Sequence, residues 1–440
     1  MAASAPADRV LEVVDGQRQE LVDLCLRLGN ARDYAGDEIE VAKAVEAWLA
    51  ETGIETRLQR IGGDSANAVG ILRGAGDRSS GARSLILNAH MDTQGATPAA
   101  GAEEEQRLRG AHEQDGLLFG NGLANDKAQL AAQMISVRAI VRSGIRLCET
   151  LYVTGVAQET GAPPERSEEI AEWSGVGPRM SQVREGYGAR WLVEHGIIAD
   201  YALVGEITDF KLGLGQAGYL RLRIAVPGHL RYTPLLIRGE TPNDNPNPFE
   251  RAAHVISALE AWAKTYERTD ALDFGKGTIV PRAQVCEVAA GGLPFTEVSD
   301  SCNVFFDARL VPGTRPAEIL DRVRRALGAT GLDCEISPYD YRRGYLSEDA
   351  DPLGEAVGRA HRLVFDEEME FADSGPISTW RDTNAFNEAG IPAVCYGGRA
   401  RSAFLGGGLA GDRRPMAVDD LLALSKVYAL TALDLCGVVP

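Results

Sequence analysis

The sequence has no Cys-x-x-Cys pair, although it contains seven cysteines. The seven are dispersed along the chain, and most lie in apolar stretches such as Val394-Cys395-Tyr396. Their positions are Cys25, Cys148, Cys286, Cys302, Cys334, Cys395 and Cys436. An odd, dispersed set is typical of buried free thiols in a reducing compartment, which argues against a disulfide scaffold.

Long apolar runs and an excess of positive charge are also missing. Residues 1–8 hold no apolar signal core and no run is long enough to span a membrane, so we expect a cytoplasmic protein without a membrane partner. The net charge of -18 argues against a nucleic-acid partner, because little positive charge is available to neutralise phosphates. With 440 residues, 45% of them hydrophobic, we expect a soluble globular protein of two domains.

The first part of the chain alternates between helical and strand-like patterns. Apolar residues recur at helical spacing in residues 9–29, 36–52, 127–143 and 188–195. Strands are predicted at residues 56–59, 68–72, 85–89, 150–156 and 201–206, an exposed loop at 95–115, and an insertion at 162–185. This alternation favours an α/β domain with a mostly parallel sheet.

The pattern changes after Asp209. Residues 219–226 alternate apolar and polar side chains, as a half-exposed antiparallel strand does. A helix at 248–268, strands at 283–290 and 303–310, a helix at 316–327 and a strand at 333–336 follow. This β-α-β-β-α-β order predicts a ferredoxin-like α+β domain at 214–338, inserted into a domain made of 1–213 and 339–440.

The strand at 85–89 delivers His90 and Asp92 to its carboxyl end, where open α/β sheets bind ligands. Residues two apart on an extended segment point to the same side, so Asp92 is placed to orient the His90 imidazole for metal binding. Taken alone, the pair fits a buried core histidine beside a turn aspartate better.

Three carboxylates further along the chain change that balance. Glu159 and Glu206 lie at or just past the ends of predicted strands, and Asp126 lies at the start of a helix. Each alone would be explained as a helix cap or a solvated turn. On one rim of a parallel sheet they would meet His90, and carboxylates with an imidazole suit Zn²⁺, Mn²⁺ or Co²⁺. The joint pattern predicts a metal site formed by His90, Asp126, Glu159 and Glu206.

Four motifs give the chain a resemblance to a known family. They span residues 88–92, 120–127, 158–161 and 204–206, with supporting stretches at 307–313, 382–392 and 418–421. In this order they resemble the di-zinc aminoacylase and exopeptidase family, which includes acetylornithine deacetylase, succinyl-diaminopimelate desuccinylase and a glutamate-releasing carboxypeptidase. The resemblance implies a zinc-peptidase-like catalytic domain whose inserted domain serves as lid and dimerisation domain, and therefore a homodimer.

The resemblance also implies roles for single residues. The residue matching Asp126 bridges two metal ions, and those matching His90 and Glu206 complete one site. The residue matching Glu159, with a late histidine, completes the other site, and the residue matching Asp92 orients His90.

The chain departs from the family's pattern at three places. The family's Glu-Glu pair is Gln158-Glu159 here, and a glutamine amide cannot take the proton that the first Glu accepts as general base. The late histidine is absent, because none follows His361. The lid histidine that reaches the oxyanion across the dimer is replaced by Tyr232, and Tyr232 or Arg231 can still donate a hydrogen bond there.

Substrate contacts are expected on two segments. Arg381, Asp382 and Asn384 occupy the family's substrate-side loop, where Arg381 is able to clamp a carboxylate or, alternatively, to form an interdomain salt bridge. Arg309 occupies the family's strand-end arginine position, where a structural role is the alternative.

One metal site is thus intact and the other lacks a ligand, which leaves two functions open. The first is a metal-dependent hydrolase of an amide or peptide-like bond in a small carboxylate-bearing substrate, a deacylase or dipeptidase with one or two Zn²⁺, Mn²⁺ or Co²⁺ ions and Glu159 as base. The alternative is a non-hydrolytic member, either a ligand-binding pseudo-peptidase or an enzyme for another acyl or amino-acid reaction.

Overall fold

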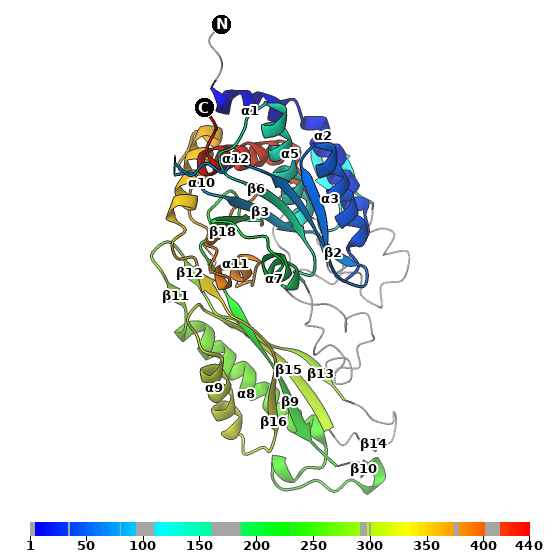
Figure 1. The fold of residues 1–440 in the computed structure, drawn as a ribbon. Coiled ribbons are helices and arrows are strands. Elements are labelled where there is room, and N and C mark those ends of the chain that lie inside the picture. The colour runs from blue at the N-terminus through cyan, green and yellow to red at the C-terminus, as the bar shows by residue number, and fades with distance from the viewer. Residues whose placement is uncertain are drawn as a thin grey trace.

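The computed structural model describes residues 5–33, 36–79, 81–93, 110–160, 186–229, 231–290, 297–298, 301–373, 378–400 and 414–440. These residues form two bodies, one built on a six-stranded sheet and the other on a four-stranded sheet (Figure 1). No helix in these ranges is both long enough and apolar enough to cross a membrane.

The six-stranded sheet forms the centre of the larger body. In spatial order its strands are β1 (Glu55–Gly62), β2 (Ser65–Leu72), β6 (Leu151–Val156), β3 (Leu85–His90), β7 (Tyr201–Val204) and β18 (Ala393–Cys395). The pairs β3–β6, β3–β7 and β7–β18 are parallel, and β1–β2 and β2–β6 are antiparallel. All of β3 is buried, which explains its apolar sequence. The predicted mostly parallel α/β sheet is confirmed.

Helices cover both faces of this sheet. One face carries α1 (Pro6–Asp15), α2 (Arg18–Asn30), α3 (Ile39–Glu51), α5 (Ala128–Arg142), α10 (Asp351–Phe365) and α12 (Val418–Cys436), and the other carries α7 (Tyr187–Glu194) and α11 (Thr383–Glu388). Leu85 and Leu87 of β3 join the first core and Ile86 joins the second, as a two-residue period requires. Residues 9–29, predicted to be helical, form parts of two helices that separate at Gly16.

A small three-stranded sheet lies beside the larger one. It consists of β4 (His112–Gln114), β5 (Leu117–Phe119) and β19 (Met416–Ala417). The loop predicted at 95–115 therefore ends in a strand, because residues 112–114 pair with 117–119. The rest of that loop up to residue 109, and the insertion predicted at 162–185, lie outside the described residues.

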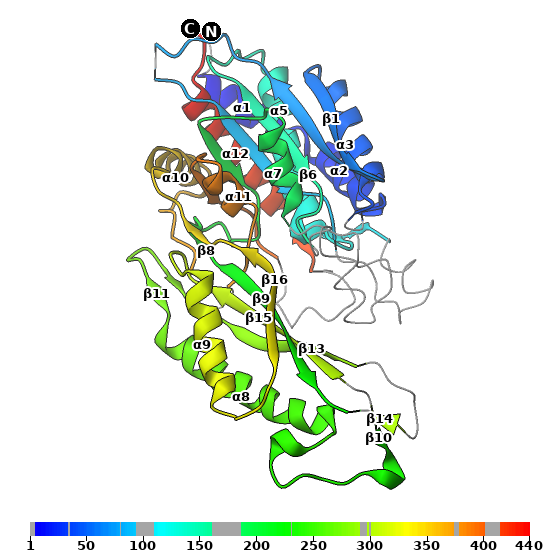
Figure 2. The same ribbon diagram turned by 60° about the horizontal axis from the view of Figure 1, so that its bottom comes forward.

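The second body is an antiparallel sheet with two helices on one face (Figure 2). Its strands are β13 (Ala283–Ala289), β15 (Ser301–Leu310), β9 (Gly218–Pro227) and β16 (Glu335–Arg342), and its helices are α8 (Pro248–Thr269) and α9 (Pro316–Gly328). The chain order with this strand order is ferredoxin-like. The strand predicted at 333–336 runs to Arg342, because it pairs with β9 as far as Tyr219.

Shorter elements complete the second body. They are β10 (Arg231–Tyr232) paired with β14 (Glu297–Val298), β11 (Leu272–Asp273) paired with β12 (Thr278–Ile279), and the 3-10 turns Thr233–Leu235 and Pro242–Asp244. The β10–β14 pair lies at the end of this body that points away from the larger one (Figure 1).

Two connections that join the bodies run side by side as β8 (Gly215–Gln216) and β17 (Tyr345–Leu346). A Cβ atom on Gly344 would lie 2.4 Å from the Gly218 nitrogen, so the backbones approach too closely for a side chain. Asn384 bridges both connections: its Nδ2 donates to the Ala217 oxygen and its Oδ1 accepts from the Tyr345 nitrogen, each at 3.1 Å.

We expect Gly344→Ala to destabilise the protein by roughly 1–3 kcal/mol, because the added methyl group meets backbone atoms that have no room to move aside. The measurement is urea unfolding followed by fluorescence and circular dichroism. Gly328→Ala is the matched control, because a Cβ atom there meets nothing within 4 Å. Equal losses of unfolding free energy in the two variants would contradict the steric explanation.

Candidate metal centre

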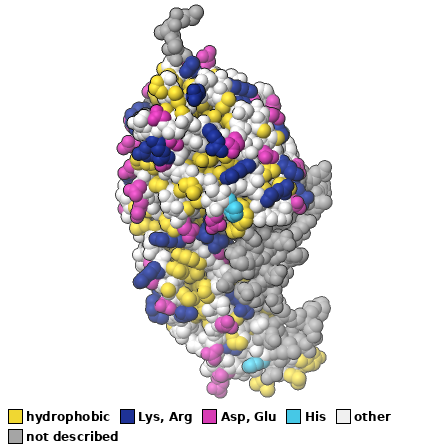
Figure 3. Space-filling view, in the orientation of Figure 1, with side chains coloured by type: hydrophobic (Ala, Val, Ile, Leu, Met, Phe, Trp, Pro, Cys, Tyr) yellow, Lys and Arg dark blue, Asp and Glu magenta, His cyan; other side chains and the backbone are white. Residues whose placement is uncertain are grey.

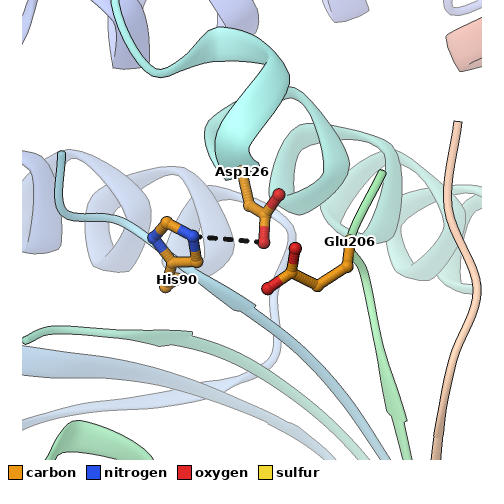
Figure 4. A group of neighbouring side chains, drawn as sticks. All are labelled: His90, Asp126 and Glu206. Atoms are coloured by element: carbon orange, nitrogen blue, oxygen red, sulfur yellow. Dashed lines mark ion pairs between the residues drawn. The ribbon is translucent and has the colours of Figure 1, made fainter. Parts of the chain in front are cut away.

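His90, Asp126 and Glu206 point toward one another at the carboxyl ends of the parallel strands β3 and β7 (Figure 4). One ligand atom from each residue lies within 4.8 Å of the others, and all three residues are buried. Among the described residues this is the one cluster of three or more such side chains close enough to share an ion. The arrangement therefore offers one imidazole and two carboxylates to a cation.

Strand register brings His90 and Glu206 to the same level. Asn88 of β3 pairs with Val204 of β7, so the residues two positions later emerge together. Asp126 comes from the turn that precedes α5, whose start is held by Gly122 at φ 64°. A Cβ atom at Gly122 would lie 1.8 Å from Thr93, so this turn requires glycine.

The imidazole of His90 is oriented through its Nδ1 atom. Nδ1 lies 3.0 Å from the carbonyl oxygen of Asp92 and 3.6 Å from its carboxylate oxygen Oδ1. A proton on Nδ1 is therefore donated to the carbonyl, which leaves the Nε2 lone pair for an ion. Nε2 lies 3.3 Å from Asp126 Oδ2 and 3.9 Å from Glu159 Oε2. The orienting partner expected at Asp92 acts through its backbone oxygen.

The carboxylate of Asp92 holds the loop that carries Glu159. Its Oδ1 accepts from the Glu159 nitrogen at 2.9 Å, and its Oδ2 accepts from the nitrogen and hydroxyl of Thr160 at 2.9 and 2.6 Å. Glu38 binds the preceding residue of the same loop, because its Oε1 accepts a hydrogen bond from the Gln158 nitrogen at 3.1 Å. Three consecutive backbone amides are thus bound by two buried carboxylates.

Gln158 and Glu159 point in different directions. Gln158 has φ 58°, and its side-chain amide donates to the Ser65 hydroxyl at 2.9 Å, at the start of β2. The carboxylate of Glu159 approaches His90 instead. Of the two residues, Glu159 is the one that lies beside His90.

The ligand atoms lack the partners that buried polar atoms normally have. Neither His90 Nε2 nor either carboxylate oxygen of Asp126 has a hydrogen-bond partner among the described residues. Burial and the charge of Glu206 raise the pKa of Asp126 well above its usual range. A divalent cation would remove both costs, so the donor set fits Zn²⁺, Mn²⁺ or Co²⁺.

Three of the residues expected to contact substrate make internal contacts. Arg381 Nε lies 3.4 Å from Glu206 Oε2, and Asp382 Oδ2 accepts from Asn88 Nδ2 at 3.2 Å. Burial raises the pKa of Asp382 to about 7. The side-chain amide of Asn384 forms its hydrogen bonds at the junction between the two bodies. This loop therefore supports the metal ligands and the junction from within the protein.

The remaining predicted residues lie on the second body. Arg309 Nη2 pairs with Asp307 Oδ2 at 3.0 Å, and its guanidinium lies over the Tyr219 ring. Arg231 and the exposed Tyr232 form β10, far from β3 within one chain (Figures 1 and 2). Of the Arg231 side chain nothing is described.

The burial of two charged residues near the centre is not indicated by the sequence. Glu38 is fully buried, although its place just before a helix is typical of an exposed cap. Lys127, next to Asp126, is also fully buried and forms an ion pair with Asp33, which accepts a further hydrogen bond from Thr93. A lysine inside a predicted helix start carries no local signal of such a partner.

The fold, and the buried group formed by His90, Asp126 and Glu206, are those expected of the metallopeptidase class. The sequence profile of Peptidase family M20/M25/M40 matches residues 86–434, and the chain belongs to this family. The family resemblance and the fold class predicted from the sequence are confirmed.

Individual relatives are distant but similar over much of their length. The uncharacterized protein YgeY of Escherichia coli is 24% identical over 326 residues, 72% of each chain. Succinyl-diaminopimelate desuccinylase of Thioalkalivibrio sulfidiphilus is 24% identical over 71% of this chain and 74% of its own.

Solved structures share the fold. Aminopeptidase PepT of Bacillus cereus, at 16% identity, has a TM-score of 0.68 and covers 96% of this chain and 99% of its own. The dipeptidase Dug1p of Saccharomyces cerevisiae, at 12% identity, has a TM-score of 0.67 and covers 98% of both chains. YxeP of Bacillus subtilis, described as a dinuclear metal-binding peptidase, has a TM-score of 0.60 at 15% identity, over 95% of this chain and 98% of its own.

We expect Glu38→Gln to change how stability depends on pH. Burial and the nearby Asp92 charge raise the pKa of Glu38 to about 8, so the folded protein holds this proton more tightly than the unfolded chain. Its contribution to stability is present below the unfolded pKa and is lost as pH rises toward 8. Glutamine keeps the acceptor oxygen and cannot ionise.

The measurement is urea unfolding of the metal-free protein at pH 5 and pH 8. The variant should gain at least about 1 kcal/mol relative to wild type between these two values. Glu40→Gln, on the exposed side of the same helix, is the control. A parallel pH dependence in wild type and Glu38→Gln would refute the linkage.

Proposed function

We propose that this protein is a metal-dependent hydrolase that cleaves an amide or peptide-like bond in a small carboxylate-bearing substrate, as a deacylase or dipeptidase does. The observation that supports the proposal is the buried His90-Asp126-Glu206 group with the Glu159 carboxylate beside it. The names of relatives, among them a desuccinylase and dipeptidases, support the same class of substrate.

His90, Asp126 and Glu206 would hold one Zn²⁺, Mn²⁺ or Co²⁺ ion, and Asp126 with Glu159 provides part of a second, incomplete site. When bound, the metal polarises the scissile carbonyl and makes a water molecule more acidic. The incompleteness rests on the sequence, because no histidine follows His361.

Glu159 is the proposed general base. It would take the proton of the attacking water and pass it to the leaving nitrogen, which is the role of a positioned carboxylate. Its geometry depends on Asp92, because two of the hydrogen bonds to Asp92 come from Glu159 and Thr160 backbone nitrogens. Gln158 is proposed to shape this loop through Ser65 and to take no part in proton transfer.

We further propose a homodimer formed through the second body. Its outer segment exposes large apolar side chains: Leu235 is 69% and Ile237 83% exposed. Figure 3 shows hydrophobic side chains at this end of the molecule. In a dimer, Tyr232 or Arg231 of one subunit would donate to the oxyanion in the other, and Arg309 would bind the substrate carboxylate.

The seven free cysteines, five of them buried, support a cytoplasmic location.

The lost histidine and Gln158 also favour a second candidate function, a ligand-binding member that has lost hydrolysis. The two functions differ in whether Glu159 transfers protons.

We expect Glu159→Gln to lower kcat for amide hydrolysis by about 10²–10⁴-fold, because the amide cannot accept a proton. The measurement is a hydrolysis screen of N-acyl amino acids and dipeptides with Zn²⁺, Mn²⁺ or Co²⁺ added. Gln158→Glu is the matched control and should change kcat by no more than a few-fold. Hydrolysis that survives Glu159→Gln would exclude Glu159 as base, and wild-type protein inactive with all three metals would favour the ligand-binding alternative.

We expect Ile237→Asp to shift the protein from dimer to monomer, because a charge replaces an apolar side chain within the contact. The measurement is sedimentation velocity across a concentration series. Leu363→Asp is the control, since Leu363 is 70% exposed on α10 of the larger body. A monomeric wild-type protein, or a dimer unaffected by Ile237→Asp, would disprove this interface.

A further inference from the structure

Arg381 is a largely buried cation that lies beside Glu206 of the candidate metal centre. Its side chain is 15% exposed, and its Nε lies 3.4 Å from Glu206 Oε2. Its Nη2 donates to the Ile207 oxygen at 3.5 Å. Its donors are thus directed at groups of the protein around Glu206.

Without Arg381, the candidate metal centre carries more negative than positive charge. Asp126, Glu159 and Glu206 bring three carboxylates to His90, and Asp126 and Glu159 approach its Nε2 to 3.3 and 3.9 Å. With the guanidinium included, the three negative charges are reduced to two, which one divalent cation balances.

The contact also leaves a ligand atom for that ion. A carboxylate has two oxygens, and the guanidinium approaches Glu206 through Oε2. The other oxygen, Oε1, would remain to bind an ion together with Asp126 and His90. Because Arg381 keeps its charge at any pH at which the protein folds, this cation is permanent.

We propose that Arg381 is a built-in second cation, which limits the centre to one tightly bound divalent ion and weakens its affinity for that ion. The inference rests on the metal binding proposed above and goes beyond it, because it assigns to one residue the stoichiometry of the site. The missing late histidine and the position of Arg381 would then both favour one bound ion.

The test is titration of the metal-free full-length protein with Mn²⁺, monitored by calorimetry and by electron paramagnetic resonance. The resonance spectrum distinguishes a lone Mn²⁺ ion from a coupled pair. We expect wild type to bind one equivalent with the spectrum of a lone ion. Arg381→Met should lower the Kd for Mn²⁺ at least tenfold and admit a second equivalent at higher Mn²⁺. Arg381→Lys, which keeps the charge, should stay within a few-fold of wild type.

Arg342→Met is the matched control, because Arg342 is 12% exposed and pairs with the buried Asp340 at 3.2 Å in the second body. It should leave Mn²⁺ binding unchanged. Two tight equivalents in wild type, or an unchanged or higher Kd in Arg381→Met, would overturn the proposal. Arg381→Gln replaces Arg381→Met if the latter fails to fold, and wild-type stoichiometry is decisive in either case. A protein that binds one Mn²⁺ and hydrolyses nothing refutes the hydrolase and leaves this proposal standing.

Discussion

The carboxylate of Asp92 connects the strand that carries His90 with the loop that carries Glu159. Its oxygens accept three hydrogen bonds from residues 159 and 160, while its carbonyl oxygen faces His90 Nδ1. One residue therefore sets the tautomer of the histidine and the position of the nearby carboxylate. An apolar side chain here would leave the backbone amides of Glu159 and Thr160 without their acceptors, which is costly. Loop and strand are consequently held as one unit.

Several of the buried acidic side chains near the centre have partners that compensate their charge. Asp33 is paired with the fully buried Lys127, Glu206 is paired with Arg381, and Glu38 is bound by backbone amides. Asp126 has no such partner among the described residues, and its pKa is raised accordingly. A group that is buried, charged and uncompensated is found where a cation belongs, because an isolated charge in a protein interior is otherwise strongly unfavourable. Asp126 thus differs from Asp33, Glu206 and Glu38, because among the described residues neither a lysine or arginine nor a backbone amide pairs with its carboxylate.

Much of the candidate site could be predicted because strand ends are visible in the sequence. His90 follows the apolar run 85–87, and Glu206 follows a second such run, so two parallel strands bring them to one edge. The ferredoxin-like order of the second body was likewise apparent from alternation in β9 and from helical spacing in α8 and α9. Element ends are harder to predict: the sequence predicts a loop where β4 lies and a shorter strand than β16, because pairing rather than composition extends these strands.

The direction of individual side chains could not be predicted. Gln158 and Glu159 are adjacent, and nothing local indicates that one points to Ser65 and the other to His90; that depends on acceptors 67 and 120 residues away in the chain. For Arg381 the sequence left a substrate carboxylate and an interdomain salt bridge open, and in the structure Arg381 lies beside Glu206, which follows β7.

The sequence by itself determined the types of elements, their order and the residues that gather at the sheet edge, since those follow from local periodicity and parallel topology. The tertiary structure alone decided which acids are compensated by a cation or an amide and which, like Asp126, are not, because charge compensation acts through space between segments that only folding brings together.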